Sequence, residues 1–116
     1  MTLPSKRPAR DPGSLDPAVL DALANVMDPE IGLSLVDLGL VYRAVVGGDA
    51  VEVALTLTTR ACPLGEMILD EARDSLAQRF PGHSRIDVRL VWEPLWTPDF
   101  ITPRGRDLLG RPSRTA

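Results

Sequence analysis

The chain has 116 residues, of which 44% are hydrophobic and 4% aromatic, and its formal net charge is −3. This length and composition suit one globular domain with a mainly aliphatic core. No apolar run reaches the roughly 18 residues of a membrane span, the first residues lack a secretory signal, and the single cysteine excludes an intrachain disulfide. We therefore expect a cytoplasmic protein that does not enter a membrane.

Charge is distributed unevenly along the chain. Residues 1–13 sum to +2 and residues 104–116 to +3, so residues 14–103 must sum to −8 to give the total of −3. An acidic body argues against nucleic-acid binding as the main activity. The Pro-rich, basic residues 1–13 and the short tail 112–116 are expected to be solvated chain ends, with a single domain at 14–111.

The predicted elements follow in the order α-β-β-α-β-α. Asp16 caps a first helix that begins at Pro17, and Pro29 is expected to stop it. Alternation, helical spacing and turn residues predict the later elements. A loop 28–39 is followed by strands 40–46 and 51–58, which flank the turn 47–49. A long helix after Cys62, a strand 86–93 and a short helix between Thr102 and Gly110 complete the chain.

This order predicts an α+β fold, a small single-domain two-layer sandwich with helices packed on one face of a three-stranded sheet. In the second strand, alternate side chains are expected to divide between a buried face and a wetter face. The buried set is Val51, Val53, Leu55 and Leu57, and the wetter set is Glu52, Ala54, Thr56 and Thr58.

Cys62, the single cysteine, stands where a strand gives way to a helix. If Pro63 is the first helical residue, the sulfur faces unpaired backbone N–H groups, which favour a thiolate. Arg60 acts in the same direction, whereas Glu66 opposes it. A small buried cysteine that only packs is the competing interpretation.

Several kinds of site are excluded by residue content. One cysteine and one histidine cannot complete a tetrahedral zinc site in a monomer, and there is no CxxC motif or phosphate-binding loop. His83 lies beside Ser84 in a predicted turn, which gives no indication of a catalytic triad. What remains is a thiolate completed by a second subunit, a bound cluster or metal, or a partner protein. A cysteine nucleophile is a further option, but no base is recognisable near it.

Three blocks and their order carry a resemblance to a known family. They are "MDPEIGLSLVDLGLVY", "LTLTTRACPLGEMILDEARDSL" and "IDVRLVWEPLWTPDFITPRGRDLLG". Together they resemble the SufT-like family of iron–sulfur assembly factors, which includes subunits of the eukaryotic cytosolic targeting complex and the PaaD subunit of phenylacetate degradation. The resemblance extends over about residues 15 to 111 and implies that 14–111 is a SufT-like iron–sulfur assembly domain with a compact α+β fold.

The resemblance also implies a set of site residues. The family's hallmark cysteine falls on Cys62, which could be a metal ligand shared with a partner or second subunit. The remaining matches are acidic loop residues, a threonine and a tryptophan, at Asp28, Glu30, Asp37, Thr58 and Trp96.

Each of these matches has a structural alternative that the sequence leaves open. Asp28 would only cap a turn, and Asp37 would bond the loop backbone near Gly39. Thr58 would be an ordinary strand residue, and Trp96 a lid on the core rather than a contact for a partner.

The chain departs from the family in places. Arg60 and Ala61 stand where members often have proline or glycine, and "LTTRACPLG" differs from the "PTYSGCPA" typical of the PaaD branch, which argues against that branch.

The resulting hypothesis is a non-enzymatic accessory factor in iron–sulfur cluster assembly or delivery. A transient cluster is the cofactor it could hold, and its partners would be the assembly machinery and recipient apo-proteins. Because clusters usually need several cysteines, a homodimer or a recipient would supply the other ligands. The alternatives are an adaptor with a structural cysteine, binding through "PLWTPDF" and the last helix, and an accessory subunit of a phenylacetyl-CoA oxygenase-type system.

Overall fold

A computed structural model describes residues 12–29, 31–58 and 65–110. None of the helices in these three ranges is long and apolar enough to cross a membrane. The elements are the 3₁₀-helix η2 (Pro12–Ser14), α1 (Pro17–Leu23), β1 (Val41–Gly47), β2 (Ala50–Leu55), α2 (Gly65–Arg79), β3 (Arg85–Leu90), the 3₁₀-helix η3 (Pro98–Phe100) and α3 (Pro103–Leu108).

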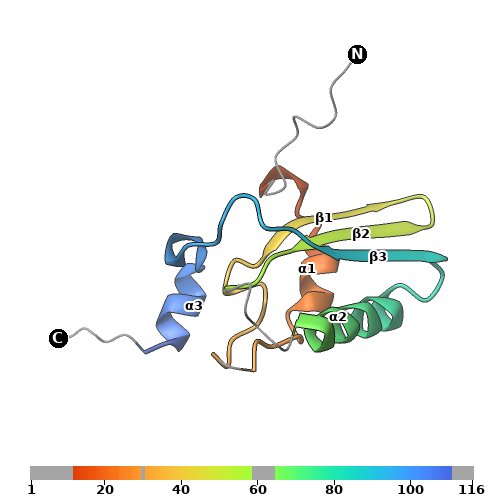
Figure 1. Ribbon diagram of the computed structural model, residues 1–116. Coiled ribbons are helices and arrows are strands. Elements are labelled where there is room, and N and C mark those ends of the chain that lie inside the picture. Colours follow the sequence, from red (N-terminus) through yellow and green to blue (C-terminus); the bar gives the residue numbers. More distant parts are fainter. Residues whose placement is uncertain (1–11, 30, 59–64, 111–116) are drawn as a thin grey trace, which may run out of the picture.

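The three strands form one mixed sheet in the order β1-β2-β3. β1 and β2 are antiparallel and joined by a tight turn, whereas β2 and β3 are parallel, so the chain crosses over through α2 between them. Figure 1 shows α1 and α2 on one side of the sheet. The predicted α+β fold with a three-stranded sheet is confirmed. α3, however, lies beyond the end of the sheet where β1 begins, rather than over the helix-covered face (Figure 1).

The core lies between the sheet and the two covering helices. Val51, Val53 and Leu55 of β2 are buried, as their alternation predicts, and they face apolar stripes on both helices. These stripes consist of Val19, Ala22 and Leu23 on α1 and of Ile68, Leu69, Ala72 and Leu76 on α2.

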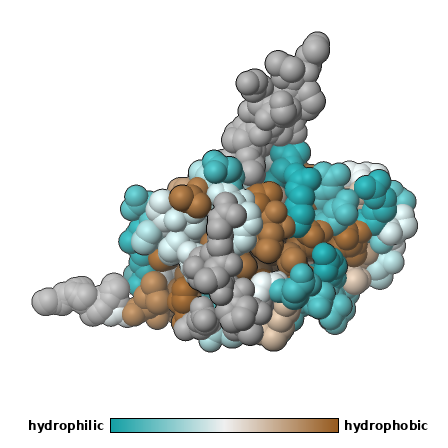
Figure 2. Space-filling view, in the orientation of Figure 1, coloured by the Kyte–Doolittle hydropathy of each residue, from teal (hydrophilic) through white to brown (hydrophobic). Residues whose placement is uncertain are grey.

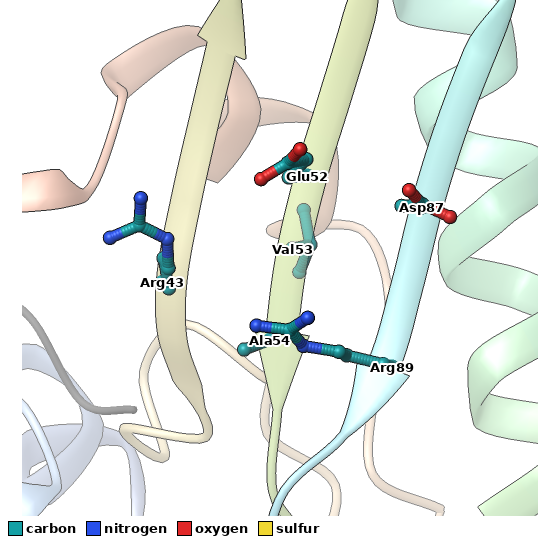
Figure 3. Close-up of a pocket in the computed structure, with 6 residues that line it drawn as sticks. All are labelled: Arg43, Glu52, Val53, Ala54, Asp87 and Arg89. Atoms are coloured by element: carbon teal, nitrogen blue, oxygen red, sulfur yellow. The ribbon is translucent and has the colours of Figure 1, made fainter. Parts of the chain in front are cut away.

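The opposite face of the sheet carries charged side chains (Figure 3). Arg43, Glu52, Asp87 and Arg89 line a shallow hollow there, around Ala54 at its centre. Ala54 is only 1% exposed although it stands on the face expected to be wetter. Figure 3 shows the Arg89 side chain extending across Ala54, and a long aliphatic stem of this kind can cover an alanine methyl group.

The first helix is shorter than predicted. It ends at Leu23 with Ala24 as its cap, so Pro29 is not the residue that stops it. Val26 and Met27 instead pair with residues 34 and 35, through an isolated bridge from Met27 to Ser34 and a 2.9 Å hydrogen bond from Leu35 N to Val26 O. Val26 is therefore buried through a turn rather than on a helix face.

Both predicted helix caps are confirmed. Asp16 Oδ1 accepts hydrogen bonds from Ala18 N at 2.8 Å and Val19 N at 3.3 Å. Thr102 Oγ1 accepts one from Gly105 N at 2.9 Å. Caps of this kind stabilise a helix by about 1 kcal/mol each, which matters for helices as short as α1 and α3.

The hairpin end of the sheet is fastened to the start of β3. The Ser84 hydroxyl donates to Asp49 Oδ2, and Arg85 N donates to Asp49 O at 3.1 Å. The Ser84 hydrogen bond is the main reason that the pKa of the Asp49 carboxyl lies below its ordinary value.

Gly39 and Gly48 give a matched pair of stability tests. Both have positive φ, +75° and +58°, but a Cβ at Gly39 would collide with Phe100 O, whereas a Cβ at Gly48 would meet open space. We expect Gly48→Ala to cost about 1 kcal/mol for the backbone conformation alone, and Gly39→Ala to cost more than about 3 kcal/mol because the collision is added. Urea unfolding measures both, and equal losses would contradict the close approach of Phe100.

Candidate functional site

Two stretches that are distant in the sequence meet at the end of the sheet opposite the hairpin. They are the loop 34–40 and the stretch formed by residues 91–102 and α3 (Figure 1). Thr56, which follows β2, joins them because its N–H donates to Leu40 O at 2.9 Å. The candidate residues Asp37 and Trp96 belong to these stretches, and Thr58 lies two residues after Thr56.

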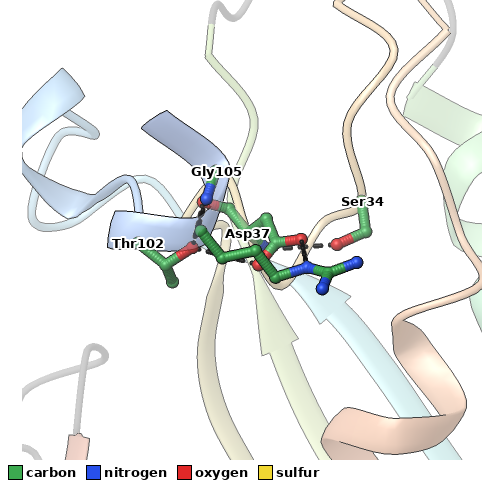
Figure 4. Close-up of polar contacts among 5 residues, drawn as sticks. Ser34, Asp37, Thr102 and Gly105 are labelled. Atoms are coloured by element: carbon green, nitrogen blue, oxygen red, sulfur yellow. Dashed lines mark hydrogen bonds and ion pairs between the residues drawn. The ribbon is translucent and has the colours of Figure 1, made fainter. Parts of the chain in front are cut away.

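Asp37 fastens α3 to the loop (Figure 4). Its Oδ1 accepts a hydrogen bond from Thr102 Oγ1 at 3.0 Å, and its Oδ2 lies 3.2 Å from Arg104 Nε. Its backbone oxygen accepts from Thr102 N at 2.9 Å, and its own N–H donates to Ser34 Oγ at 3.0 Å. These bonds direct the carboxylate to α3, whereas the structural alternative from the sequence was a bond to the backbone near Gly39.

Trp96 lies half-buried against the core. Its Nε1 donates to Leu38 O at 2.7 Å, in the residue next to Asp37. Two residues earlier, Pro94 O accepts from the hydroxyl of the fully buried Tyr42 at 2.8 Å. The segment is thus held at two points, which agrees with Trp96 as a lid on the core, while a contact between Trp96 and a partner stays a prediction.

Asp28 closes a separate turn. It is 3% exposed, and its Oδ1 accepts from Ile31 N at 3.3 Å. Its backbone oxygen accepts from Gly32 N at 2.7 Å, and its N–H donates to Leu33 O at 2.8 Å. Asp28 and Asp37 therefore stabilise different turns, at opposite ends of the stretch 28–37.

Thr58 is half-buried and is the last described residue before the stretch that contains the thiol. Cys62 and Glu30 lie outside the described residues, as does the expected helix start at Pro63. Within ranges 12–29, 31–58 and 65–110, no group of three His, Cys, Asp or Glu side chains is arranged to hold a metal ion.

Three residues of this end of the molecule were missed by reasoning from sequence. Tyr42 and Arg104 bond to residues 52 and 67 positions away, and Thr102 was expected to cap α3 but not to bind Asp37. Local patterns carry no signal for such distant partners. The bond between Ser34 and Asp37 could have been predicted from the sequence. A serine hydroxyl often accepts a hydrogen bond from the backbone N–H three residues later, which is a common turn motif.

The family model for iron–sulfur cluster assembly proteins matches residues 16–88, which is more than half of the chain. The chain belongs to this family. The match includes Asp28, Asp37, Thr58 and the position of Cys62, but ends before Trp96 and α3.

Individual relatives agree with the family match. The chain is 38% identical over 93 residues to an iron–sulfur protein maturation auxiliary factor of Bacillus subtilis, covering 79% of this chain and 90% of the relative. It is 40% identical over 86 residues to a similarly named factor of Staphylococcus aureus, and the match covers 73% of this chain and 97% of that relative. A solved domain of unknown function from Bacillus anthracis matches with a TM-score of 0.76 and 28% identity, covering 81% of this chain and 90% of that domain.

Asp37 can be tested as the anchor of α3. Asp37→Ala removes an acceptor that is only 14% exposed and breaks its bond with Thr102, so we expect a loss of about 1–2 kcal/mol. Arg104→Ala is the control, because this side chain is 77% exposed and its ion pair should contribute less than about 0.5 kcal/mol. Urea unfolding of both variants measures the difference. Equal losses would show that the ion pair, and not the Thr102 bond, holds α3.

Proposed function

We propose that this chain is a non-enzymatic accessory factor of the cytoplasm that helps to assemble iron–sulfur clusters or deliver them to recipient apo-proteins. The observation that carries this is the family match over residues 16–88, which contains the single cysteine. The maturation factors of B. subtilis and S. aureus support it by their names and by their coverage over nearly their whole length.

Cys62 is the proposed functional thiol. Thiolates are the usual protein ligands of iron–sulfur clusters, and a cluster usually takes several. A chain with one cysteine can therefore hold a cluster only as cargo, sharing its coordination with a recipient, with another assembly factor or with a second copy of itself. An open coordination shell of this kind suits transfer better than storage.

The described residues on either side of this segment are firmly held. Leu57 is 5% exposed, and a Cβ at Gly65, the first described residue of α2, would lie 3.2 Å from Leu57 Cδ1. Leu57, two residues after β2, thus packs against the start of α2. Anchored flanking residues of this kind support the proposed role in docking to partners.

Cys62→Ser tests the proposal directly. In cells that depend on this chain, we expect the variant to lower the activities of iron–sulfur enzymes as far as deletion does, because serine lacks the soft sulfur ligand. The unfolding midpoint of the purified variant should stay close to that of the unchanged chain. Met67→Leu, which removes the sulfur of a side chain 41% exposed on α2, is the matched control and should leave the enzyme activities unchanged. Full enzyme activities with Cys62→Ser would refute the proposed role of the thiol.

A second candidate function is an adaptor in which the cysteine is structural. Large apolar side chains are exposed beside the candidate site: Leu95 is 64% exposed, Leu108 55% and Leu109 47%. Figure 2 shows the apolar surface near the C-terminal end of the described chain. Leu108 and Leu109 are adjacent at the end of α3, and neighbouring exposed apolar side chains are typical of protein-binding surfaces.

The two candidates differ in which substitution abolishes function. If the adaptor role is correct, Cys62→Ala keeps enzyme maturation, whereas Trp96→Phe lowers it by removing the bond that holds the 94–96 segment on Leu38. If the thiol is functional, Cys62→Ala fails. The rate of thiol alkylation of the native chain at neutral pH gives an independent measurement, because a functional thiolate reacts fast and a packed thiol is protected.

A further inference from the structure

β3 is an edge of the sheet formed by the described residues. Its pairing with β2 is parallel, and the hydrogen bonds at its two ends fix which backbone groups face β2: Arg85 N donates to Asp49 O at 3.1 Å and Val91 N to Leu55 O at 2.8 Å. Because residues alternate in a parallel ladder, the N–H and C=O groups that face away from β2 are those of Ile86, Val88 and Leu90.

The side chains of β3 alternate as well. Ile86, Val88 and Leu90 point toward the helices, and the charged residues between them point to the open face. Figure 3 shows Asp87 and Arg89 together on that open face, beside Glu52. The edge therefore has outward backbone groups at the apolar positions and opposite charges at the positions between them.

We infer that β3 pairs antiparallel with β3 of a second copy of this chain, around a two-fold axis at Val88. This register places Val88 opposite Val88 and Ile86 opposite Leu90, and all of these residues have outward backbone groups. It also places Asp87 opposite Arg89 of the second copy, twice by symmetry. The inference goes beyond the proposed function and does not depend on it.

Other registers fit less well. A shift that centres the axis on Asp87 would bring together backbone groups already used by β2, and would set Asp87 against Asp87 and Arg85 against Arg89. An axis at Ile86 would pair Arg85 with Asp87, but would align only residues 85–87 within both strands. The axis at Val88 aligns five residues and opposes no like charges.

The pairing stabilises the edge in three ways. Three outward residues per copy can exchange about six main-chain hydrogen bonds. Ile86 and Leu90 are half-buried in the single chain, so their contact would cover apolar surface that is now exposed. Each cross-strand pair of opposite charges contributes roughly 0.2–1 kcal/mol.

The pairing also has costs. Val88 O now accepts a 3.3 Å hydrogen bond from Arg73 Nη2, which must be exchanged for the N–H of Val88 in the second copy. Arg73 retains its pair with Asp70 at 3.2 Å. Arg89 must rotate away from Ala54, over which it lies in Figure 3. Since one short strand makes a small interface, we expect a reversible dimer with a Kd of about 10–1,000 μM.

Charge reversal tests the partner and the register. In sedimentation equilibrium of the full chain under reducing conditions, Asp87→Arg and Arg89→Asp should each weaken the dimer by roughly tenfold or more, because like charges then meet across the strands. An equimolar mixture of the two variants should dimerise again, since each then faces its complement. Arg85→Gln is the control on the same strand and face, because Arg85 lies opposite Val91 in this register. It removes the 3.2 Å ion pair that Arg85 makes with Asp87 in the same strand, and it should not weaken the dimer because Asp87 is then free to face Arg89 of the second copy.

Amide hydrogen exchange locates the interface. The N–H groups of Ile86, Val88 and Leu90 should become protected as the protein concentration rises, while circular dichroism confirms that every variant is folded. Several results would overturn the inference: a monomer at about 1 mM, a dimer insensitive to both reversals, a mixture that stays monomeric, or unprotected amides in a dimer.

Discussion

The parallel pairing of β2 with β3 is the constraint on which the rest of the molecule depends. Two parallel neighbours cannot be joined by a tight turn, so the chain must leave β2 at one end of the sheet and return to the other end through α2. This crossover puts α2 over the core face, next to α1. It also puts Thr56, which follows β2, at the end of the sheet where the loop 34–40 lies.

Loops at that end are fixed by hydrogen bonds rather than by regular secondary structure. Asp37 bonds to Thr102 and Arg104, Trp96 bonds to Leu38 O, and Tyr42 bonds to Pro94 O, so polar contacts tie residues 37–42 to residues 94–104. Each such bond contributes only about 1 kcal/mol net, but together they remove most of the freedom of these loops. For the proposed docking to partners, such loops are favourable because less entropy is lost when a partner binds a loop that is already ordered.

Reasoning from sequence predicted those elements whose determinants are local. The cap at Asp16, the cap at Thr102 and the alternation of Val51, Val53 and Leu55 depend on neighbouring residues, and all were found in the structure. The predicted end of the first helix was wrong. Val26 is buried in a turn that bonds to residue 35, and helical spacing in the sequence cannot distinguish a residue buried in such a turn from one buried on a helix face.

The position of α3 could not be predicted from the sequence either, because its short apolar pattern does not indicate which part of the molecule it packs against. The residue that holds it, Asp37, lies 65 positions before Thr102. Resemblance to a family identified Asp37 as a candidate site residue, but its contacts show a carboxylate engaged with α3. A family match can therefore identify a residue correctly while leaving open whether it acts on a ligand or on the fold that presents one.

The two edges of the sheet differ in how far other residues cover them, and this difference affects whether two copies of the chain can associate. At the β1 edge, Leu15 forms a bridge with Ala44, and Asp16 N donates to Ala44 O at 2.8 Å, so residues before α1 occupy part of that edge. At the β3 edge, the described cover is one guanidinium at 3.3 Å from Val88 O. Exposed edges are normally blocked by charge, proline or covering segments. The charges of β3 instead favour pairing with a second copy. When two β3 strands run antiparallel, Asp87 of each copy lies opposite Arg89 of the other. Under the proposed function, association between copies and binding of other proteins would both bring further ligands to the single thiol.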